Sequence, residues 1–378
     1  MKRYMFAAAS TLALVGGTAH AGNLDRTKTP IDIIFEEGNH AELSFGSVSP
    51  TISGRDYLGN TVANVADDFT LIGSGIKFQL TDRASFAIIQ DQPYGVDVLY
   101  GGDPASTLLG GTMAQADTTG LTMLMRYDVG NGIGLYGGPR VVRADGEVTL
   151  SGLAYGPLNG YNVRFRSDQA VGYVLGAVYE IPEIAFRAAL TYHSEIDLEM
   201  PSVETFPAGI PGVPPGVPLI GGTTNSTLPQ SVKLQVQSGI AENTLAFGSI
   251  RWSEHSVFTL VPPIAGRNLT ELDDAWSYEV GLGRRLTDKL SASIAYMYED
   301  EENNDLVSPL APTKGRQSLA LRAKYQVTDA VSIAGGIRYI WIGDAQPETP
   351  GPGSPDVARA AFTGNDAIGV GMQIGISF

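Results

Sequence analysis

The sequence contains no cysteine among its 378 residues, which suits a chain that crosses an oxidising compartment where free thiols would react. It has no run of 18 apolar residues, and this excludes transmembrane helices. Basic residues are scarce, because 25 lysines and arginines against 40 acids give a net charge of −15. Such an acidic chain lacks the basic surface that nucleic-acid binding requires, so we expect no nucleic-acid partner.

Histidine is scarce as well, since only His40, His193 and His255 follow the first 21 residues. A hydrolase needs a base beside a nucleophile on one face of its fold. His193 and His255 each precede a serine, but neighbouring side chains on a strand point to opposite faces. His193 and Glu195 would share a face without a paired serine. We therefore predict no enzymatic activity and no cofactor.

The acidic run Glu299–Glu302, followed by Asp305, is the one cluster that suggests a cation. Calcium takes several oxygen ligands, but the run lacks the glycine-hinged spacing of a dedicated site. We interpret it as a solvated outer loop and predict no metal site.

The first residues carry an export signal. Lys2 and Arg3 form a positive region, and Phe6 to Val15 form an apolar core. That core is too short to span a bilayer as a helix, which takes about 20 residues. Thr18-Ala19-His20-Ala21 ends in the small-residue pattern that signal peptidase cuts. We predict a signal peptide over 1–21 and a mature chain that begins at Gly22.

The C-terminus has the clearest strand pattern. Apolar residues alternate without a break from Ile368 to Phe378, with Gly369, Gly371 and Gln373 among the residues between them. Period two predicts a strand with one face on lipid and the other in a barrel lumen. A last strand that ends in phenylalanine also resembles the signature read by the barrel assembly machinery, which we expect as a partner.

The same alternation recurs in about fourteen segments, and short and long connections alternate between them. Short periplasmic turns and long outer loops are typical of bacterial outer-membrane barrels. We therefore predict an all-β fold, a single antiparallel transmembrane β-barrel over 41–378 that contacts outer-membrane lipid. The segments are 41–52, 69–80, 84–94, 116–128, 131–152, 160–180, 183–199, 228–238, 243–259, 270–286, 289–302, 314–327, 330–343 and 365–378. The long connections are 53–68, 92–115, 153–160, 199–227, 259–270, 302–314 and 344–364.

The segment 22–40 precedes the first strand. Fully extended it could reach about 60 Å, enough to thread a barrel. Fourteen strands leave a lumen intermediate between a filled eight-strand barrel and an open channel of sixteen to eighteen strands. The segment is either a partial plug of this lumen or a periplasmic tail.

One outer loop, 206–222, is both proline-rich and apolar. Proline makes it stiff and free of helix, and an apolar patch on a surface usually marks a contact with something hydrophobic. Capture of a hydrophobic molecule and packing against neighbouring loops both account for it. The candidate capture residues are Phe206, Ile210, Val213, Val217, Leu219 and Ile220.

Several stretches resemble the FadL/TodX family of outer-membrane transporters. They are Leu228-Pro229-Gln230-Ser231 at the start of a strand, Ile250 to Phe258, Arg187 to Ile196, and Pro93-Tyr94-Gly95 at the end of the third strand. The resemblance implies a fourteen-stranded barrel that carries long-chain fatty acids or aromatic hydrocarbons inward. The chain departs from the family in its short N-terminal segment and in having no Asn-Pro-Ala motif. The family's gating mechanism therefore cannot be carried over.

A cargo with a carboxylate would need a cation in the lumen, because an unpaired charge is costly away from water. Alternation predicts that six cations face inward: Arg187, Lys233, Arg251, Arg322, Lys324 and Arg338. Arg187 and Arg251 lie in the family-like stretch and are the favoured pair. Each cation could instead pair with a lumen acid such as Glu195 or Glu279.

The leading hypothesis is passive transport of hydrophobic small molecules across the bacterial outer membrane. Pro93 interrupts a strand ladder, so a kink there, with Gly95, would suggest lateral exit through the wall. A porin-like diffusion channel for polar solutes is the alternative, and a structural or adhesive barrel is the third hypothesis.

Overall fold

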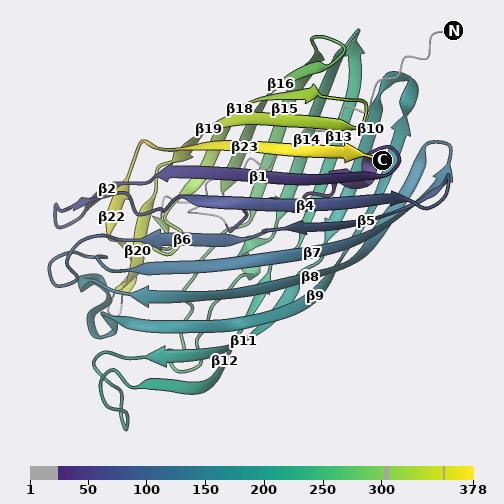
Figure 1. Ribbon diagram of the computed structural model, residues 1–378. Helices are drawn as coiled ribbons and strands as arrows, with labels where there is room; N and C mark the ends of the chain where they lie inside the picture. The colour runs from purple at the N-terminus through teal and green to yellow at the C-terminus, as the bar shows by residue number, and fades with distance from the viewer. Residues whose placement is uncertain (1–23, 302–305, 352–353) are drawn as a thin grey trace.

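The protein is a closed antiparallel β-barrel in a computed structural model that describes residues 24–301, 306–351 and 354–378 (Figure 1). The predicted signal peptide lies outside the described residues. The first wall strand, β1 (His40–Thr51), pairs with both β4 (Phe69–Gln79) and the last strand, β23 (Asn365–Ser377), which closes the barrel. In the described part of the chain, no helix has the length and apolar character needed to cross a membrane.

The main sheet contains 17 strands. Three wall strands are each interrupted once, so the wall has the fourteen that the sequence predicts. The interrupted strands are β5 (Ala84–Asp91) with β6 (Gly95–Leu99), β10 (Phe186–His193) with β11 (Ile196–Thr205), and β12 (Pro218–Leu228) with β13 (Ser231–Ala241). The other wall strands are β7 (Met113–Gly130), β8 (Ile133–Leu150), β9 (Tyr161–Ile181), β14 (Thr244–Ser253), β15 (Ala275–Arg285), β16 (Leu290–Glu301), β18 (Lys314–Gln326) and β19 (Val331–Gly343).

The predicted period-two pattern is confirmed in the wall. In β23, Ile368, Val370 and Met372 are exposed on the outer face, whereas Ala367 and Gly369 face inward and are buried. Outward aromatic side chains gather where β15 and β16 approach the outer loops, and Trp276 stacks on Tyr278 with ring centroids 6.4 Å apart. Such a girdle marks a membrane interface.

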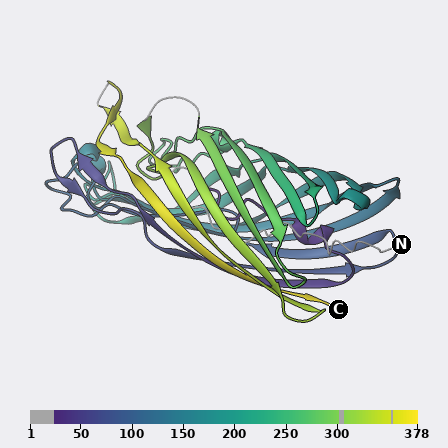
Figure 2. The ribbon, with the colours of Figure 1, turned by 90° about the horizontal axis from the view of Figure 1, so that it is seen from above.

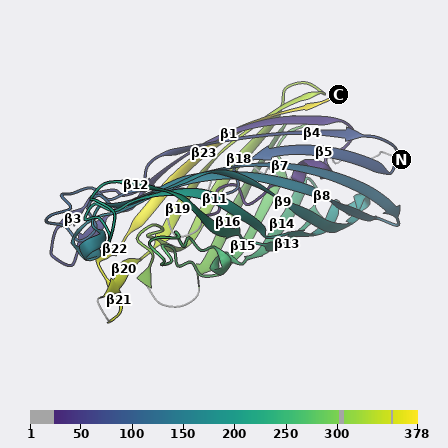
Figure 3. The same ribbon diagram turned by 90° about the horizontal axis from the view of Figure 1, so that it is seen from below.

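Short turns lie at one end of the barrel and long loops at the other. Gly130, Asn131 and Gly132 all have positive φ in the turn between β7 and β8, a conformation that glycine and asparagine adopt at low cost. The C-terminus lies at the end with the short turns (Figure 2). The small outer strands β20 (Gln346–Gly351) and β22 (Ala360–Phe362) lie at the opposite end (Figure 3). By the rule for bacterial barrels, the short turns mark the periplasmic end.

The prediction of a loop over 199–227 is wrong for most of that range. β11 and β12 pair from Ile196–Leu228 to Thr205–Pro218 and extend the wall outward, so only 206–217 is a loop. Threonine, serine and glycine make 218–228 resemble a loop, but Ser226 and Leu228 maintain the inward face opposite Leu198 and Ile196. Cross-strand pairing therefore outweighs the local composition.

The segment before β1 lies inside the barrel. It includes the short helix η1 (Asp32–Phe35), and Ile31, Ile33, Ile34 and Phe35 are buried against inward residues of β5, β7, β8, β9 and β10. Phe35 packs edge-on against Tyr136 of β8 with ring centroids 5.5 Å apart. Burial of these side chains positions the rest of the segment across the lumen.

Candidate functional site

The lumen holds an apolar cluster in its outer half, and in its periplasmic half a charged cavity beside the apolar cluster around η1. The outer half is an apolar cluster formed by inward residues of β8, β9, β11 and β12 together with the outer loops. Val148, Tyr161 and Leu198 belong to it, and Leu24 and Tyr94 lie at its base. A molecule that enters from outside therefore meets apolar side chains first.

The candidate capture loop is partly packed and partly exposed. Phe206 is buried and contacts Tyr161, with ring centroids 4.9 Å apart. Ile210 and Leu219 pack against the apolar cluster, and Val213 is half-buried. Val217 and Ile220 remain 41% and 73% exposed. Packing against neighbouring elements therefore accounts for Phe206, Ile210 and Leu219, whereas Val217 and Ile220 leave an exposed apolar tip where the loop meets β12.

A second outer loop is fastened to the β11–β12 hairpin by one buried carboxylate. Glu204 accepts hydrogen bonds from the Tyr161 hydroxyl at 2.8 Å and from the backbone N–H groups of Ile264 and Ala265 at 2.9 and 2.8 Å. A buried carboxylate is stable only when its oxygens are bonded in this way. The contact joins residues 60 positions apart in the sequence, and local pattern gave no signal for it.

At mid-height the N-terminal segment is held by buried charges. Asp25 is fully buried and accepts hydrogen bonds from the guanidinium of Arg251, and Nε2 of His255 lies 3.4 Å from the Asp25 carboxylate. Burial alone would raise the pKa of Asp25, but the charge of Arg251 and the neighbouring His255 outweigh it. The pKa of Asp25 is therefore held well below its ordinary value.

A second ion pair holds the same segment. Lys28 Nζ lies 2.7 Å from Glu299 of β16, and Glu299 also pairs with Arg316 of β18. The interpretation of Glu299 as part of a solvated outer loop is therefore wrong, because Glu299 lies within β16 and is buried, whereas Glu302 and Asp305 of that run lie outside the described residues. Burial lowers the pKa of Lys28 to about 8, although Glu299 favours the charged form.

Below these contacts lies a cavity of about 310 Å³ between the N-terminal segment and β10, β13, β14, β15, β16, β18 and β19. Eleven of the residues that line it are lysine or arginine and three are acidic, a local excess of positive charge in an acidic protein. All six cations that alternation placed in the lumen line it: Arg187, Lys233, Arg251, Arg322, Lys324 and Arg338.

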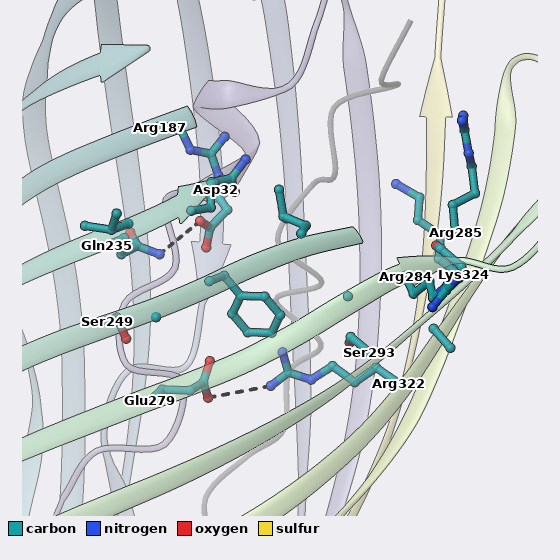
Figure 4. A pocket seen from close by; sticks show the side chains of 18 of the residues that line it. Asp32, Arg187, Gln235, Ser249, Glu279, Arg284, Arg285, Ser293, Arg322 and Lys324 are labelled. Atoms are coloured by element: carbon teal, nitrogen blue, oxygen red, sulfur yellow. Dashed lines mark hydrogen bonds and ion pairs between the residues drawn. The ribbon is translucent and has the colours of Figure 1, made fainter. Parts of the chain in front are cut away.

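These cations differ in their partners (Figure 4). Arg322 and Arg338 share Glu279, at 3.8 and 3.4 Å. Arg187 donates a hydrogen bond to Gln237 at 3.1 Å and lies over the ring of Phe35.

Two further cations of the lining, Lys233 and Arg251, contrast with each other. The side chain of Lys233 has no hydrogen-bond or ion-pair partner in the described chain. Arg251 pairs with Asp25 of the N-terminal segment rather than with either acid expected from the wall, Glu195 or Glu279.

His193 and Glu195 do not share a face, because the strand is interrupted between β10 and β11. His193 is buried toward the lumen, whereas Glu195 is exposed. An interruption changes the parity of the side chains after it, which alternation alone cannot foresee.

The third wall strand is interrupted at 92–94, where Pro93 lies. Asp91 pairs with Gly120 of β7 and Gly95 pairs with Asp117, so three residues of strand three face two of β7. Thr118 bonds both the N–H and the C=O of Tyr94 through its hydroxyl. The interruption lies beside the outer apolar cluster, to which Tyr94 belongs.

A sequence profile described as outer membrane protein transport protein (OMPP1/FadL/TodX) matches residues 47–378. The chain belongs to this family. It is an outer-membrane transport protein, and the OMPP1/FadL/TodX family carries hydrophobic compounds. Comparison with curated protein sequences gives no match.

Solved structures of the OMPP1/FadL/TodX family share its fold. A FadL homologue of Pseudomonas aeruginosa is 16% identical over 98% of both chains, with a TM-score of 0.75. The toluene transporter TodX of Pseudomonas putida is 12% identical over 97% of this chain and 98% of that one, with a TM-score of 0.68. The toluene transporter TbuX of Ralstonia pickettii is 13% identical over 98% and 97%, with a TM-score of 0.63. The family assignment does not favour the porin-like alternative.

Replacing Asp25 by asparagine should release the N-terminal segment. Breaking a buried ion pair by removing one partner costs about 3–5 kcal/mol, because the other charge stays buried. The absence of cysteine allows a single spin label on a P30C background. We expect the mobile fraction of the label to rise in D25N and to stay unchanged in E147Q, which breaks an exposed ion pair with Arg164. An immobile label in D25N would contradict the role of Asp25.

The lowered pKa of Lys28 predicts that seating, the binding of the N-terminal segment in the lumen, depends on pH. The seated lysine has a pKa of about 8 against an ordinary value of 10.5, so the released segment binds more protons between these values. Seating should therefore strengthen as the pH rises from about 8 toward 10.5, and change little below 8. The mobile fraction of the P30C label should fall over this range, and K28M should abolish the fall. A mobile fraction that rises with pH would refute the assignment.

Proposed function

We propose that this OMPP1/FadL/TodX protein carries long-chain fatty acids inward across the outer membrane without energy input. The observation that supports this is the division of the lumen, with an apolar outer half above a cavity lined by eleven cations. A long apolar chain gains free energy from the first region. A carboxylate gains it from the second, where charge-assisted hydrogen bonds offset its lost hydration.

An aromatic hydrocarbon is the second candidate cargo, because the structural relatives TodX and TbuX are toluene transporters. A neutral hydrocarbon would use the apolar half alone. The cationic cavity favours the fatty acid because it offers nothing to a molecule without a charged group.

In this proposal, the exposed side chains of Val217, at the end of loop 206–217, and Ile220, in β12, form a capture tip for the cargo. The interruption at Pro93 and Gly95 releases the cargo sideways. Of the wall cations, Lys233 is the best placed to meet a carboxylate, because it lines the cavity and has no partner in the described chain. Arg187, Arg251 and Arg322 add positive potential while holding their own partners. The described part of the N-terminal segment, 24–39, obstructs the direct route through the lumen.

The proposal extends to export and assembly. A signal peptide over 1–21 directs the chain out of the cytoplasm, and the outer aromatic girdle contacts outer-membrane lipid. Phe378 at the exposed end of β23 is accessible for recognition by the barrel assembly machinery.

The test is uptake of labelled oleate by cells that lack their own hydrophobe transporter, with and without this protein. We expect uptake to be restored, and K233Q to lower its initial rate several-fold because the carboxylate loses its cation. Toluene entry should be insensitive to K233Q, and R164Q on the exposed outer wall should change neither. Oleate uptake that is absent, beside a large steady conductance in planar bilayers, would refute the proposal and indicate an open channel.

The capture tip has its own test. V217S with I220S replaces the two exposed apolar side chains and leaves the packed Phe206 in place. We expect the oleate concentration for half-maximal uptake to rise and the maximal rate to be preserved, because capture is weakened but passage is not. An unchanged concentration dependence would assign these residues to loop structure only.

A further inference from the structure

The wall has a gap in its hydrogen-bond ladder beside the interruption of strand three. Pairing between β4 and β5 ends at Ser74 and Gln90. Beyond that point β6 pairs with β7, and Leu99 N–H bonds to Val65 instead of to β4. The side-chain oxygen of Gln92, which accepts the Ile72 N–H at 2.8 Å, substitutes for a backbone pair. We call this gap, between 69–73 of β4 and 92–96, the strand-three window.

The N-terminal segment pairs with the inner edge of the window. The Arg26 N–H donates to the Pro93 carbonyl at 2.7 Å, and the Gly95 N–H donates to the Leu24 carbonyl at 2.9 Å. Asp25 and Tyr94 are the bridge partners between these two bonds. The backbone of 24–26 thus acts as an added strand on the lumen side of the interruption.

The side chain of Arg26 reaches the outer side of the wall. Its Nη1 lies 3.0 Å from the carboxylate of Asp117, which is 57% exposed, whereas Arg26 itself is only 6% exposed. On β7 the inward residues Ala114 and Thr118 are buried, and Asp117 belongs to the opposite face with Gln115 and Thr119. A side chain that starts in the lumen and ends on an outward carboxylate must pass through the wall.

Two neighbours confirm that the guanidinium occupies the window. It lies over the ring of Phe69, at the start of β4, 4.9 Å from the centroid. A Cβ on Gly95 would overlap it, with Nη1 only 2.7 Å away. Glycine at 95 therefore provides the space through which Arg26 passes.

We propose that the side chain of Arg26 closes the strand-three window and that its ion pair with Asp117 holds it there. Resting on the proposed function, this inference adds the group that regulates lateral release. Cargo leaves when 24–26 withdraw into the lumen and remove the guanidinium from the gap. The Asp25–Arg251 contact sets the depth of the segment, and the Arg26–Asp117 contact closes the wall.

The experiment compares R26A, D117N, G95A and the double variant R26A/G95A with the natural chain, and R164A serves as the matched control. R164A also removes an arginine from an ion pair, but one on the exposed outer wall. Heat-modifiable electrophoretic mobility establishes that each variant forms a barrel. The two readouts are the initial rate of oleate uptake in cells and hydrogen exchange of 24–28 and 92–97 in the purified barrel.

We expect R26A and D117N to raise both the uptake rate and the exchange of these two stretches several-fold, and R164A to change neither. G95A should act like R26A in the natural chain, because its methyl group displaces the guanidinium, and should add nothing in the R26A background. Hydrogen exchange and uptake that are unchanged in R26A and D117N would overturn the proposal that Arg26 closes the window. An effect of G95A that persists in the R26A background would overturn it as well. If the natural chain carries no oleate, the proposed function fails, and hydrogen exchange alone decides whether Arg26 closes the strand-three window.

Discussion

The arrangement of the lumen depends on one buried ion pair, between Asp25 and Arg251. Two charges taken out of water are costly unless they satisfy one another, so neither residue can leave this contact without leaving a buried charge behind. The pair fixes the N-terminal segment at mid-height, with Leu24 against the apolar cluster above and Lys28 against Glu299 below. A barrel of this width is not filled by its own wall side chains, and the held segment supplies the missing interior.

How well each part of the structure can be predicted from the sequence depends on the solvent that this part contacts. The outer face lies in lipid, which accepts only apolar side chains and fully paired backbone. That constraint imposes period two, and the fourteen strands and their alternating connections could be read from it. Outer extensions of the wall are not set in hydrocarbon, and there the polar sequence of 218–228 hid a strand.

Contacts inside the lumen are not determined by the alternation of residues along a strand. Alternation correctly turned Arg187, Lys233 and Arg322 inward, but it could not supply their partners, because contacts across the lumen join distant segments. Arg251 and Asp25 are 226 positions apart. The interruption after His193 moved Glu195 to the other face, and net acidity of the whole chain concealed a strongly basic cavity. Arg26 gave no signal at all, because its role depends on a glycine 69 positions away and on a gap in the ladder.

The position of the strand-three window relates the outer apolar cluster and the charged cavity to one step, the release of the cargo. It opens beside Leu24 and Tyr94 of the outer apolar cluster and next to Arg26, which also lines the charged cavity. An apolar chain that entered the charged cavity would lose its hydrophobic contacts and meet desolvated charges, so the free energy of the cargo favours leaving before that cavity. A carboxylate is drawn into the cavity while its chain remains above it. The proposed cargo is therefore held across the level of the window, with its apolar part beside the route into lipid, and a single side chain at that level is enough to control release.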